Sequence, residues 1–350
     1  MKIAIVGASG FGGVELLRVL LKHDKVEVCG LSSVSFTGEK ISSLYPNLRN
    51  ICDFVLLEED EAIKDAQIVF AALPHGLSES LANKCLQSGK KLVDLGADFR
   101  LNEEATYQKW YKKPFSEPSL HRFAAYCIPE LHASRLKEAR IVANPGCYPT
   151  ASALAIAPLI KQVAPNSIII DAKSGVTGAG RGLSGRTHFP AANEAFEAYS
   201  VASHRHAPEI EQTLSELAGE EVRVTFTPHL LPLNRGILAT IYASLSPNSP
   251  LANLEKEEFL KTANAIYREF YKNARFVRVL EVGESVNVRD VRGSNFCDIA
   301  LHFDDRTRRV VITSVIDNMC KGAATQAVQN MNLMCGFDEA DGIELLPTAF

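Results

Sequence analysis

The chain has 350 residues, of which 46% are hydrophobic and 22% charged, and its formal net charge is -4. This length exceeds what one ordinary core supports, so two domains are expected. The composition is typical of a folded globular protein and argues against disorder. Lys and Arg are dispersed along the chain, which argues against a nucleic-acid-binding surface.

The first 160 residues alternate short apolar runs with segments of helical periodicity. Strands are expected at 2–6, 26–31, 67–73, 91–95 and 141–143, and helices at 11–21, 77–87 and 147–160. Strands that alternate with helices predict a parallel, doubly wound sheet of Rossmann type with right-handed crossovers. Between residues 98 and 129 the pattern breaks into aromatic and Pro-rich chain, which predicts irregular loops that carry function.

From about residue 167, runs of strands with few helices replace this alternation. Strands are expected at 168–172, 222–227, 237–244, 296–303 and 310–316, and helices at 208–217, 254–271 and 319–334. This pattern predicts a second domain of α+β class with a largely antiparallel sheet. The last helix is expected to return to the first domain.

Three further classes of protein are disfavoured by the sequence. No apolar run reaches the roughly 18 residues of a membrane span, and the N-terminus lacks the pattern of a signal peptide. The eight Cys residues show no C-x-x-C spacing, so neither a zinc knuckle nor a disulfide framework is indicated. We therefore expect no metal site and a reducing, cytoplasmic compartment.

A glycine-rich turn, Gly7 to Gly13, has the spacing G-x-x-G-x-x-G and lies between the first strand and the first helix. Amides at a helix start favour a phosphate, so dinucleotide binding is preferred over a turn that only packs tightly. The second strand ends at Ser32 and Ser33, where an NAD site would place an acid on the ribose. Their hydroxyls, with Lys40, favour the 2′-phosphate of NADP, and the alternative is a role as turn and cap residues.

The segment ANPGCYPT, residues 143–150, places Cys147 at a helix start, where the helix dipole stabilises a thiolate nucleophile. The other seven Cys residues have no such setting and are expected to be inert. His204 and His206 precede a helix start at Pro208 and share one face of extended chain. A close pair of this kind favours acid–base chemistry over a structural role.

Anion-binding groups complete the set of candidate residues. KSGVTGAGR at residues 173–181 is a cradle for an anionic substrate or a flexible loop. Arg100 and Arg235 can bind carboxylate or phosphate bidentately, although a surface salt bridge is the commoner role of an Arg.

Taken in order, GASGFGG, DLGADFRL, ANPGCYPT, KSGVTGAGR and HRHAPEIEQ, followed by DNMCKGAA at residues 317–324, resemble the N-acetyl-gamma-glutamyl-phosphate reductase family. This family belongs to the wider aspartate-semialdehyde dehydrogenase group, and the resemblance covers nearly the whole chain. It implies a dinucleotide-binding domain over residues 1–147 and 317–350. It also implies a catalytic, substrate-binding and oligomerisation domain over 148–316, the cofactor NADP(H), and a homo-tetramer or homodimer.

The resemblance also implies roles for individual residues. The catalytic cysteine matches Cys147. The motif of the histidine base matches at both His204 and His206, and the role is assigned to His204 first and His206 second. By the same resemblance Asn318 would lie near the nicotinamide, and Ser174, Gly175 and Arg235 near the substrate. From the local motifs, the other expected cofactor residues are Gly7, Ser9, Gly10, Phe11, Gly12, Gly13, Ser32 and Ser33, and the other expected substrate residues are Arg100 and Glu209.

The implied reaction is the NADPH-dependent reductive dephosphorylation of N-acetyl-gamma-glutamyl phosphate in arginine biosynthesis, through a thioester on Cys147. Two alternatives remain open at this point. The same chemistry can serve another acyl group, such as aspartyl or aminoadipyl phosphate. The chain can also be a dinucleotide-binding sensor without turnover, although the cysteine and histidine motifs argue against it.

Overall fold

The computed structural model describes residues 1–348, and the chain divides into two compact units. The first unit comprises Met1–Pro145 and Ala323–Glu344. The second comprises Gly146–Gly322 together with the residues from Leu345 onward. The chain thus passes from one unit to the other between residues 145 and 146 and returns between 322 and 323.

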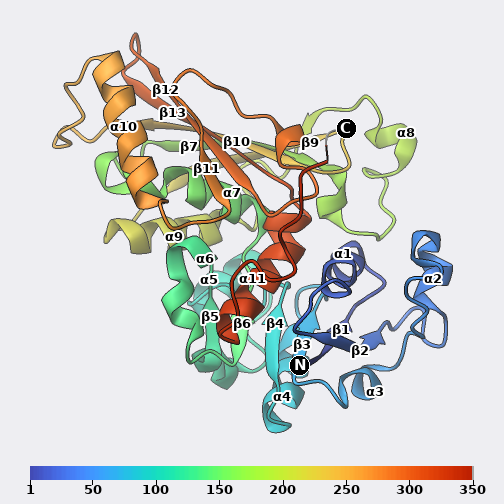
Figure 1. The fold of residues 1–350 in the computed structure, drawn as a ribbon. Coiled ribbons are helices and arrows are strands. Elements are labelled where there is room, and N and C mark those ends of the chain that lie inside the picture. The colour runs from blue at the N-terminus through green and yellow to red at the C-terminus, as the bar shows by residue number, and fades with distance from the viewer. Residues whose placement is uncertain (349–350) are drawn as a thin grey trace. The chain divides into compact units, whose positions relative to one another are not determined.

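The first unit is built on a six-stranded sheet in the order β2-β1-β3-β4-β6-β5, and every neighbouring pair is parallel (Figure 1). The strands are β1 (Lys2–Val6), β2 (Glu27–Ser32), β3 (Ile68–Ala71), β4 (Lys91–Asp94), β5 (Ala124–Tyr126) and β6 (Ile141–Ala143). The strand order reverses between β1 and β3, which is the switch point where doubly wound folds bind their ligands. The predicted Rossmann-type sheet is confirmed.

The helices of the first unit include one from the C-terminal part of the chain. They are α1 (Phe11–Leu20), α2 (Ile41–Leu44), α3 (Glu59–Ile63), α4 (Ser78–Gln87), α5 (Glu104–Tyr111), α6 (Pro129–His132) and α11 (Thr325–Met334). The last of these packs against α1, β4 and α6 (Figure 1). Oδ1 of its buried Asn332 accepts a hydrogen bond at 2.9 Å from Nε2 of His23, just beyond the end of α1. Helix α11 is therefore an integral part of this unit.

The second unit is built on a seven-stranded mixed sheet in the order β11-β12-β13-β10-β7-β9-β8. The strands are β7 (Ile168–Gly175), β8 (Glu197–Ala198), β9 (Val224–Leu231), β10 (Ile237–Ser244), β11 (Val277–Val279), β12 (Cys297–Asp304) and β13 (Arg309–Ile316). Its helices are α7 (Cys147–Ile156), α8 (Phe189–Ala192), α9 (Ala207–Ala218) and α10 (Lys256–Phe270). Four of the six strand pairs are antiparallel, so the predicted largely antiparallel sheet is confirmed.

The two faces of this sheet differ in burial. Along β10, Ala239 and Ile241 are buried on the face that α7 contacts. The alternate residues Thr240 and Tyr242 are half-exposed on the opposite face. The same alternation runs through β7, where Asp171 is paired with Thr240 in register. One face thus forms the core of the unit, and the other is only partly covered.

Three expectations about local structure were wrong. Residues 98–129 contain α5 and β5, because Tyr107 and Tyr111 pack on one face of a short helix with Phe115. Helix α7 ends at Ile156, since Pro158 lacks an amide donor and the chain tightens into a 3-10 helix. The predicted helix at 319–334 begins as a π turn. The 3-10 segments are Pro46–Leu48, Pro118–Phe123, Ala133–Leu136, Ala157–Gln162, Val176–Ala179 and Val288–Asp290, and the π turn is Cys320–Ala324.

Residues 1–348 contain neither a helix that could span a membrane nor a cluster of metal-binding side chains. None of the helices in this range is both long and apolar enough to cross a bilayer. Nor do any three His, Cys, Asp or Glu side chains in this range gather as a metal-binding group.

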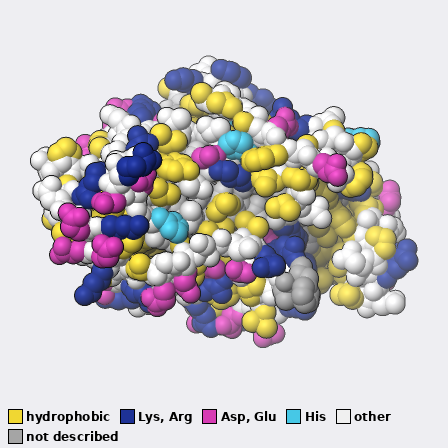
Figure 2. Space-filling view, turned by 90° about the horizontal axis from the view of Figure 1, so that it is seen from above, with side chains coloured by type: hydrophobic (Ala, Val, Ile, Leu, Met, Phe, Trp, Pro, Cys, Tyr) yellow, Lys and Arg dark blue, Asp and Glu magenta, His cyan; other side chains and the backbone are white. Residues whose placement is uncertain are grey.

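On the face shown in Figure 2, Lys and Arg side chains are interspersed with Asp and Glu.

Candidate active site

The turn after β1 is shaped by glycines that leave no room for a side chain. Gly7 has a φ of +84°, and a Cβ on it would lie 2.4 Å from the carbonyl oxygen of Ala72. A Cβ on Gly13 would lie 2.3 Å from the carbonyl oxygen of Gly7. Around Gly12, by contrast, no other part of the described chain than its neighbours and the backbone of its own helix lies within 4 Å of the Cβ position. A ligand can therefore approach the backbone here closely.

The N-terminus of α1 is open to an anion. Gly10 occupies the N-cap position, and no side chain of the described residues caps the helix. The first-turn amides, beginning at Phe11, therefore keep their positive dipole end for a ligand. These features fit the diphosphate of a nicotinamide dinucleotide.

The end of β2 lies beside this turn. The backbone amides of Gly7 and Ala8 donate to the carbonyl oxygen of Ser32 at 3.0 and 2.9 Å. The hydroxyls of Ser9 and Ser33 are hydrogen-bonded at 2.7 Å. Ser32 and Ser33 are only 2% and 4% exposed. In this arrangement Ser32 holds the turn through its carbonyl, and Ser33 shares its hydroxyl with Ser9.

In the second unit, Cys147 is the first residue of α7 and is half-buried. Gly146 is the N-cap residue, and no described side chain caps the helix there. The amide of Gly146 instead donates to Oε1 of Glu209 at 2.8 Å. Glu209 is 1% exposed, so the carboxylate that sequence reasoning assigned to the substrate contacts the turn before the thiol.

The rings of His204 and His206 both pack against the ring of Tyr148, the residue that follows Cys147. The ring centroid of Tyr148 lies 5.5 Å from that of His204 and 5.8 Å from that of His206. The two imidazole rings lie 4.8 Å apart, and Phe226 of β9 packs against His204. The structure therefore brings the predicted histidine pair to the start of α7.

The two histidines differ in their electrostatic setting. The backbone amide of His206 donates to Nδ1 of His204 at 3.1 Å. With its Nδ1 lone pair engaged, a neutral His204 ring carries its proton on Nε2. Burial, aided by the charge of Arg205, lowers the pKa of His204 to about 4. His204 is therefore neutral at pH 7, and neither of its nitrogens is free to accept a proton.

Sequence reasoning did not single out Tyr148 and Tyr199. Their hydroxyls are hydrogen-bonded at 3.2 Å, and the hydroxyl of Tyr148 also donates to the carbonyl oxygen of His229 at 3.4 Å. Burial raises the pKa of Tyr148 and raises that of Tyr199 to about 12. Both phenols therefore stay protonated and can donate hydrogen bonds. The one signal in the sequence was the position of Tyr148 directly after the candidate nucleophile.

Asn318 lies at the end of β13 with both ends of its amide engaged. Its Oδ1 accepts the backbone N–H of Gly236 at 2.8 Å, and its Nδ2 donates to Oγ1 of Thr177 at 3.0 Å. A Cβ on Gly178 would lie 3.6 Å from Nδ2 of Asn318 and 3.8 Å from Oγ of Ser174. The KSGVTGAGR segment and Asn318 therefore meet.

The remaining predicted substrate residues fall in two places. A Cβ on Gly175 would lie 2.8 Å from the backbone nitrogen of Arg235, so these two residues lie together. Arg235 is partly exposed, with Nη1 3.5 Å from Oδ2 of Asp317. Arg100 belongs to the first unit, where its Nη2 donates to the carbonyl oxygen of Leu95 at 2.7 Å.

Comparison with known protein families gives two matches. Residues 2–139 match the semialdehyde dehydrogenase NAD binding domain, and residues 147–318 match the semialdehyde dehydrogenase dimerisation domain. These two segments correspond to the parallel sheet and to the mixed sheet.

Curated relatives and solved structures match over nearly the full length. N-acetyl-gamma-glutamyl-phosphate reductases of Brachyspira hyodysenteriae and Clostridium beijerinckii are 50% and 49% identical, over 100% of both chains. Aspartate semialdehyde dehydrogenase II from Vibrio cholerae, complexed with ASA, is 16% identical with a TM-score of 0.71, over 96% of this chain and 98% of that one. The Candida albicans enzyme with NADP is 15% identical with a TM-score of 0.71, over 95% and 98%. At these identities the solved structures show a shared fold.

Proposed function

The chain belongs to the N-acetyl-gamma-glutamyl-phosphate reductase family and is a semialdehyde dehydrogenase-type oxidoreductase, and from this premise we propose its reaction. It reduces N-acetyl-gamma-glutamyl phosphate to N-acetylglutamate semialdehyde and phosphate with NADPH, as a step of arginine biosynthesis. The observation that carries the proposal is the placement of Cys147 at the first position of α7, with two histidines around the adjacent Tyr148.

Cys147 is the nucleophile of this reaction. Its thiolate attacks the acyl carbon and a C–S bond forms. The bond between the acyl carbon and the phosphate oxygen breaks, and phosphate leaves with the electron pair. The positive dipole end at the N-terminus of α7 favours the thiolate before the attack and stabilises the negative charge that develops on the acyl oxygen during it. Glu209 fixes Gly146 and thereby the direction of this helix start.

His206 is the acid–base residue, in contrast to the assignment of His204 first. His204 accepts the amide of His206 through Nδ1 and has a pKa lowered by burial, so it is suited to orient its neighbour. His206 takes the thiol proton and, after the thioester has been reduced, returns it to the alkoxide oxygen of the thiohemiacetal. The C–S bond then breaks, the semialdehyde leaves, and the hydroxyl proton passes back through His206 to restore the Cys147 thiol. The hydroxyls of Tyr148 and Tyr199, hydrogen-bonded to each other, stay protonated, and both tyrosine rings pack against His204.

The first unit would hold the cofactor, and the second unit, to which Cys147 belongs, forms the catalytic domain. When bound, the nicotinamide supplies the hydride that reduces the thioester. Gly7, Gly10, Gly12 and Gly13 would hold the diphosphate at the start of α1. A serine at the end of β2, in place of the acid that NAD-specific folds use, supports NADP over NAD.

The proposed function predicts phosphate-dependent reduction of NADP⁺ by N-acetylglutamate semialdehyde in the reverse direction. We expect kcat/KM to exceed that for aspartate semialdehyde by about 100-fold, because buried polar groups of a specific site would be left unpaired by the wrong acyl chain. NAD⁺ should be at least about tenfold poorer than NADP⁺, since the 2′-phosphate contacts are lost. Absorbance at 340 nm follows the reduction of the dinucleotide for both semialdehydes with NADP⁺ and for N-acetylglutamate semialdehyde with NAD⁺.

Other outcomes of this assay assign the chain differently. A preference for aspartate or aminoadipate semialdehyde would keep the chemistry and change the acyl group. Equal use of NAD⁺ and NADP⁺ would refute the NADP assignment. Dinucleotide binding without phosphate-dependent turnover would indicate a sensor and would overturn the proposed function.

We further propose that the chain forms a homodimer or homo-tetramer through the half-exposed face of the mixed sheet. The match of residues 147–318 to a dimerisation domain supports self-association. Light scattering should give two or four chain masses. Thr240→Arg, which places a charge at the centre of this face, should halve that mass, whereas Asp305→Asn on an exposed turn should not change it. An unchanged mass for Thr240→Arg would move the interface elsewhere.

A further inference from the structure

A wide turn connects β13 to α11. The segment Cys320–Ala324 is a π turn, and the amide of Gly322 donates to the carbonyl oxygen of Asp317, five residues earlier, at 2.9 Å. Such turns are rare and depend on outside support, because the wider ring packs less well than an α-helix.

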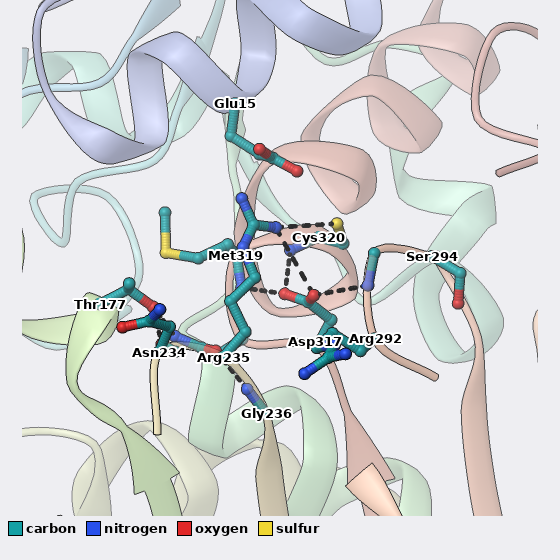
Figure 3. A network of polar contacts seen from close by, with 12 residues as sticks. Glu15, Thr177, Asn234, Arg235, Gly236, Arg292, Ser294, Asp317, Met319 and Cys320 are labelled. Atoms are coloured by element: carbon teal, nitrogen blue, oxygen red, sulfur yellow. Dashed lines mark hydrogen bonds and ion pairs between the residues drawn. The ribbon is translucent and has the colours of Figure 1, made fainter. Parts of the chain in front are cut away.

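The carboxylate of Asp317 supports the turn (Figure 3). Its Oδ1 accepts the amides of Met319 at 2.8 Å and Cys320 at 3.0 Å, and its Oδ2 accepts the amide of Gly293 at 2.7 Å. Asp317 is 0% exposed, and Nη1 of Arg235 lies 3.5 Å from Oδ2. A buried carboxylate is costly unless it is well paired, and here three amides and a guanidinium pair it. An amide in its place would present an NH₂ group to at least one of these donors.

Gly322, on this turn, lies against the candidate nucleophile. A Cβ on Gly322 would lie 2.7 Å from Cβ of Cys147 and 3.2 Å from its Cα. The φ of Gly322 lies outside the left-handed region, so the requirement for glycine is one of space. Cβ of Cys147 is one bond from the backbone, so it cannot swing away as the end of a long side chain would. An added methyl must displace Cys147 or the turn.

We propose that Asp317 is a positioning residue for Cys147. Its carboxylate fixes the π turn, the turn places Gly322 against Cys147, and this contact sets the thiol at the N-terminus of α7. The proposal rests on the proposed function for the catalytic role of Cys147, but the contact itself does not. Together with Glu209 on the amide of Gly146, it gives the nucleophile two buried carboxylates that hold it from different sides.

The first test measures the thiol without substrate. Iodoacetamide labelling of Cys147 is followed by peptide mass spectrometry between pH 5 and 9, in the full-length protein. For Gly322→Ala we expect labelling at pH 7 to be at least about tenfold slower and its pH midpoint to move upward, because the displaced thiol loses the helix dipole. The control is Gly185→Ala, which adds the same methyl to open space and should match the wild type. Labelling of Gly322→Ala within twofold of the wild type would overturn the proposal.

The second test covers the case in which Gly322→Ala does not fold. Asp317→Asn keeps the size of the side chain, and Asp305→Asn is its exposed control. We expect Asp317→Asn to shift the labelling midpoint upward and to lower kcat about 10- to 100-fold, with KM and the NADPH Kd within threefold. Loss of stability with an unshifted midpoint would show a merely structural role and overturn the proposal.

The same data separate this inference from the proposed function. If the wild type fails to reduce the acyl phosphate while the two variants shift the labelling midpoint, the proposed function fails and the positioning of Cys147 stands. If the wild type turns over and both variants label and turn over normally, the function stands and Asp317 has no positioning role.

Discussion

Cys147→Ser is expected to abolish turnover, with kcat lowered about ten-thousand-fold or more, as for removal of other enzymatic nucleophiles. Serine keeps the shape of the side chain, but its hydroxyl is not ionised near neutral pH, and so it forms no covalent acyl-enzyme at a useful rate. NADPH should still bind with an unchanged Kd, because the glycine turn belongs to the first unit. Steady-state kinetics and fluorescence titration of NADPH measure the two quantities.

The matched control for this experiment is Cys335→Ser. Cys335 is half-buried like Cys147, but burial raises the pKa of its thiol. Cys29 is also half-buried, and burial raises the pKa of its thiol as well. Iodoacetamide should therefore label Cys147 before either of them, with loss of activity, and Cys335→Ser should behave as the wild type. Near wild-type reduction of the acyl phosphate by Cys147→Ser would overturn the covalent mechanism.

Elements with strong local signals were predictable from the sequence. The apolar run at β1, the glycine turn and the periodic helix α1 give one consistent pattern, and the structure follows it to within a residue. The three-residue strand β5, Ala-Ala-Tyr, carries too few side chains to show a period. It is a strand because β6 offers it an edge in register.

The site was predictable to the level of its motifs but not of its hydrogen bonds. ANPGCYPT identifies the candidate nucleophile because a turn followed by a helix is a local property. The role of Glu209 depends on a bond to Gly146, 63 residues away, and that of Asp317 on a contact of Gly322 with Cys147. No spacing in the sequence reports such distant pairs. The choice between His204 and His206 likewise needed the direction of one backbone amide.

The histidine assignment makes the second prediction of large effect. His206→Asn should lower kcat about 100- to 10,000-fold, which is the range expected for loss of a general acid–base residue. His204→Asn should lower it less than about tenfold, since Asn Oδ1 can replace Nδ1 as the acceptor for the amide of His206. Measuring kcat and kcat/KM for both variants at saturating NADPH gives the comparison.

The pH dependence of kcat/KM provides a test that does not depend on the size of these losses. His204 has a pKa of about 4, lowered by burial, so its ring is neutral throughout pH 5 to 9. A limb of the profile that titrates between pH 5.5 and 8 therefore does not belong to His204, whose protonation would be seen only as the pH falls toward 4. We expect that limb to persist in His204→Asn and to disappear in His206→Asn. If it disappears in His204→Asn and persists in His206→Asn, the base is His204, and the amide of His206 must release Nδ1 during the reaction.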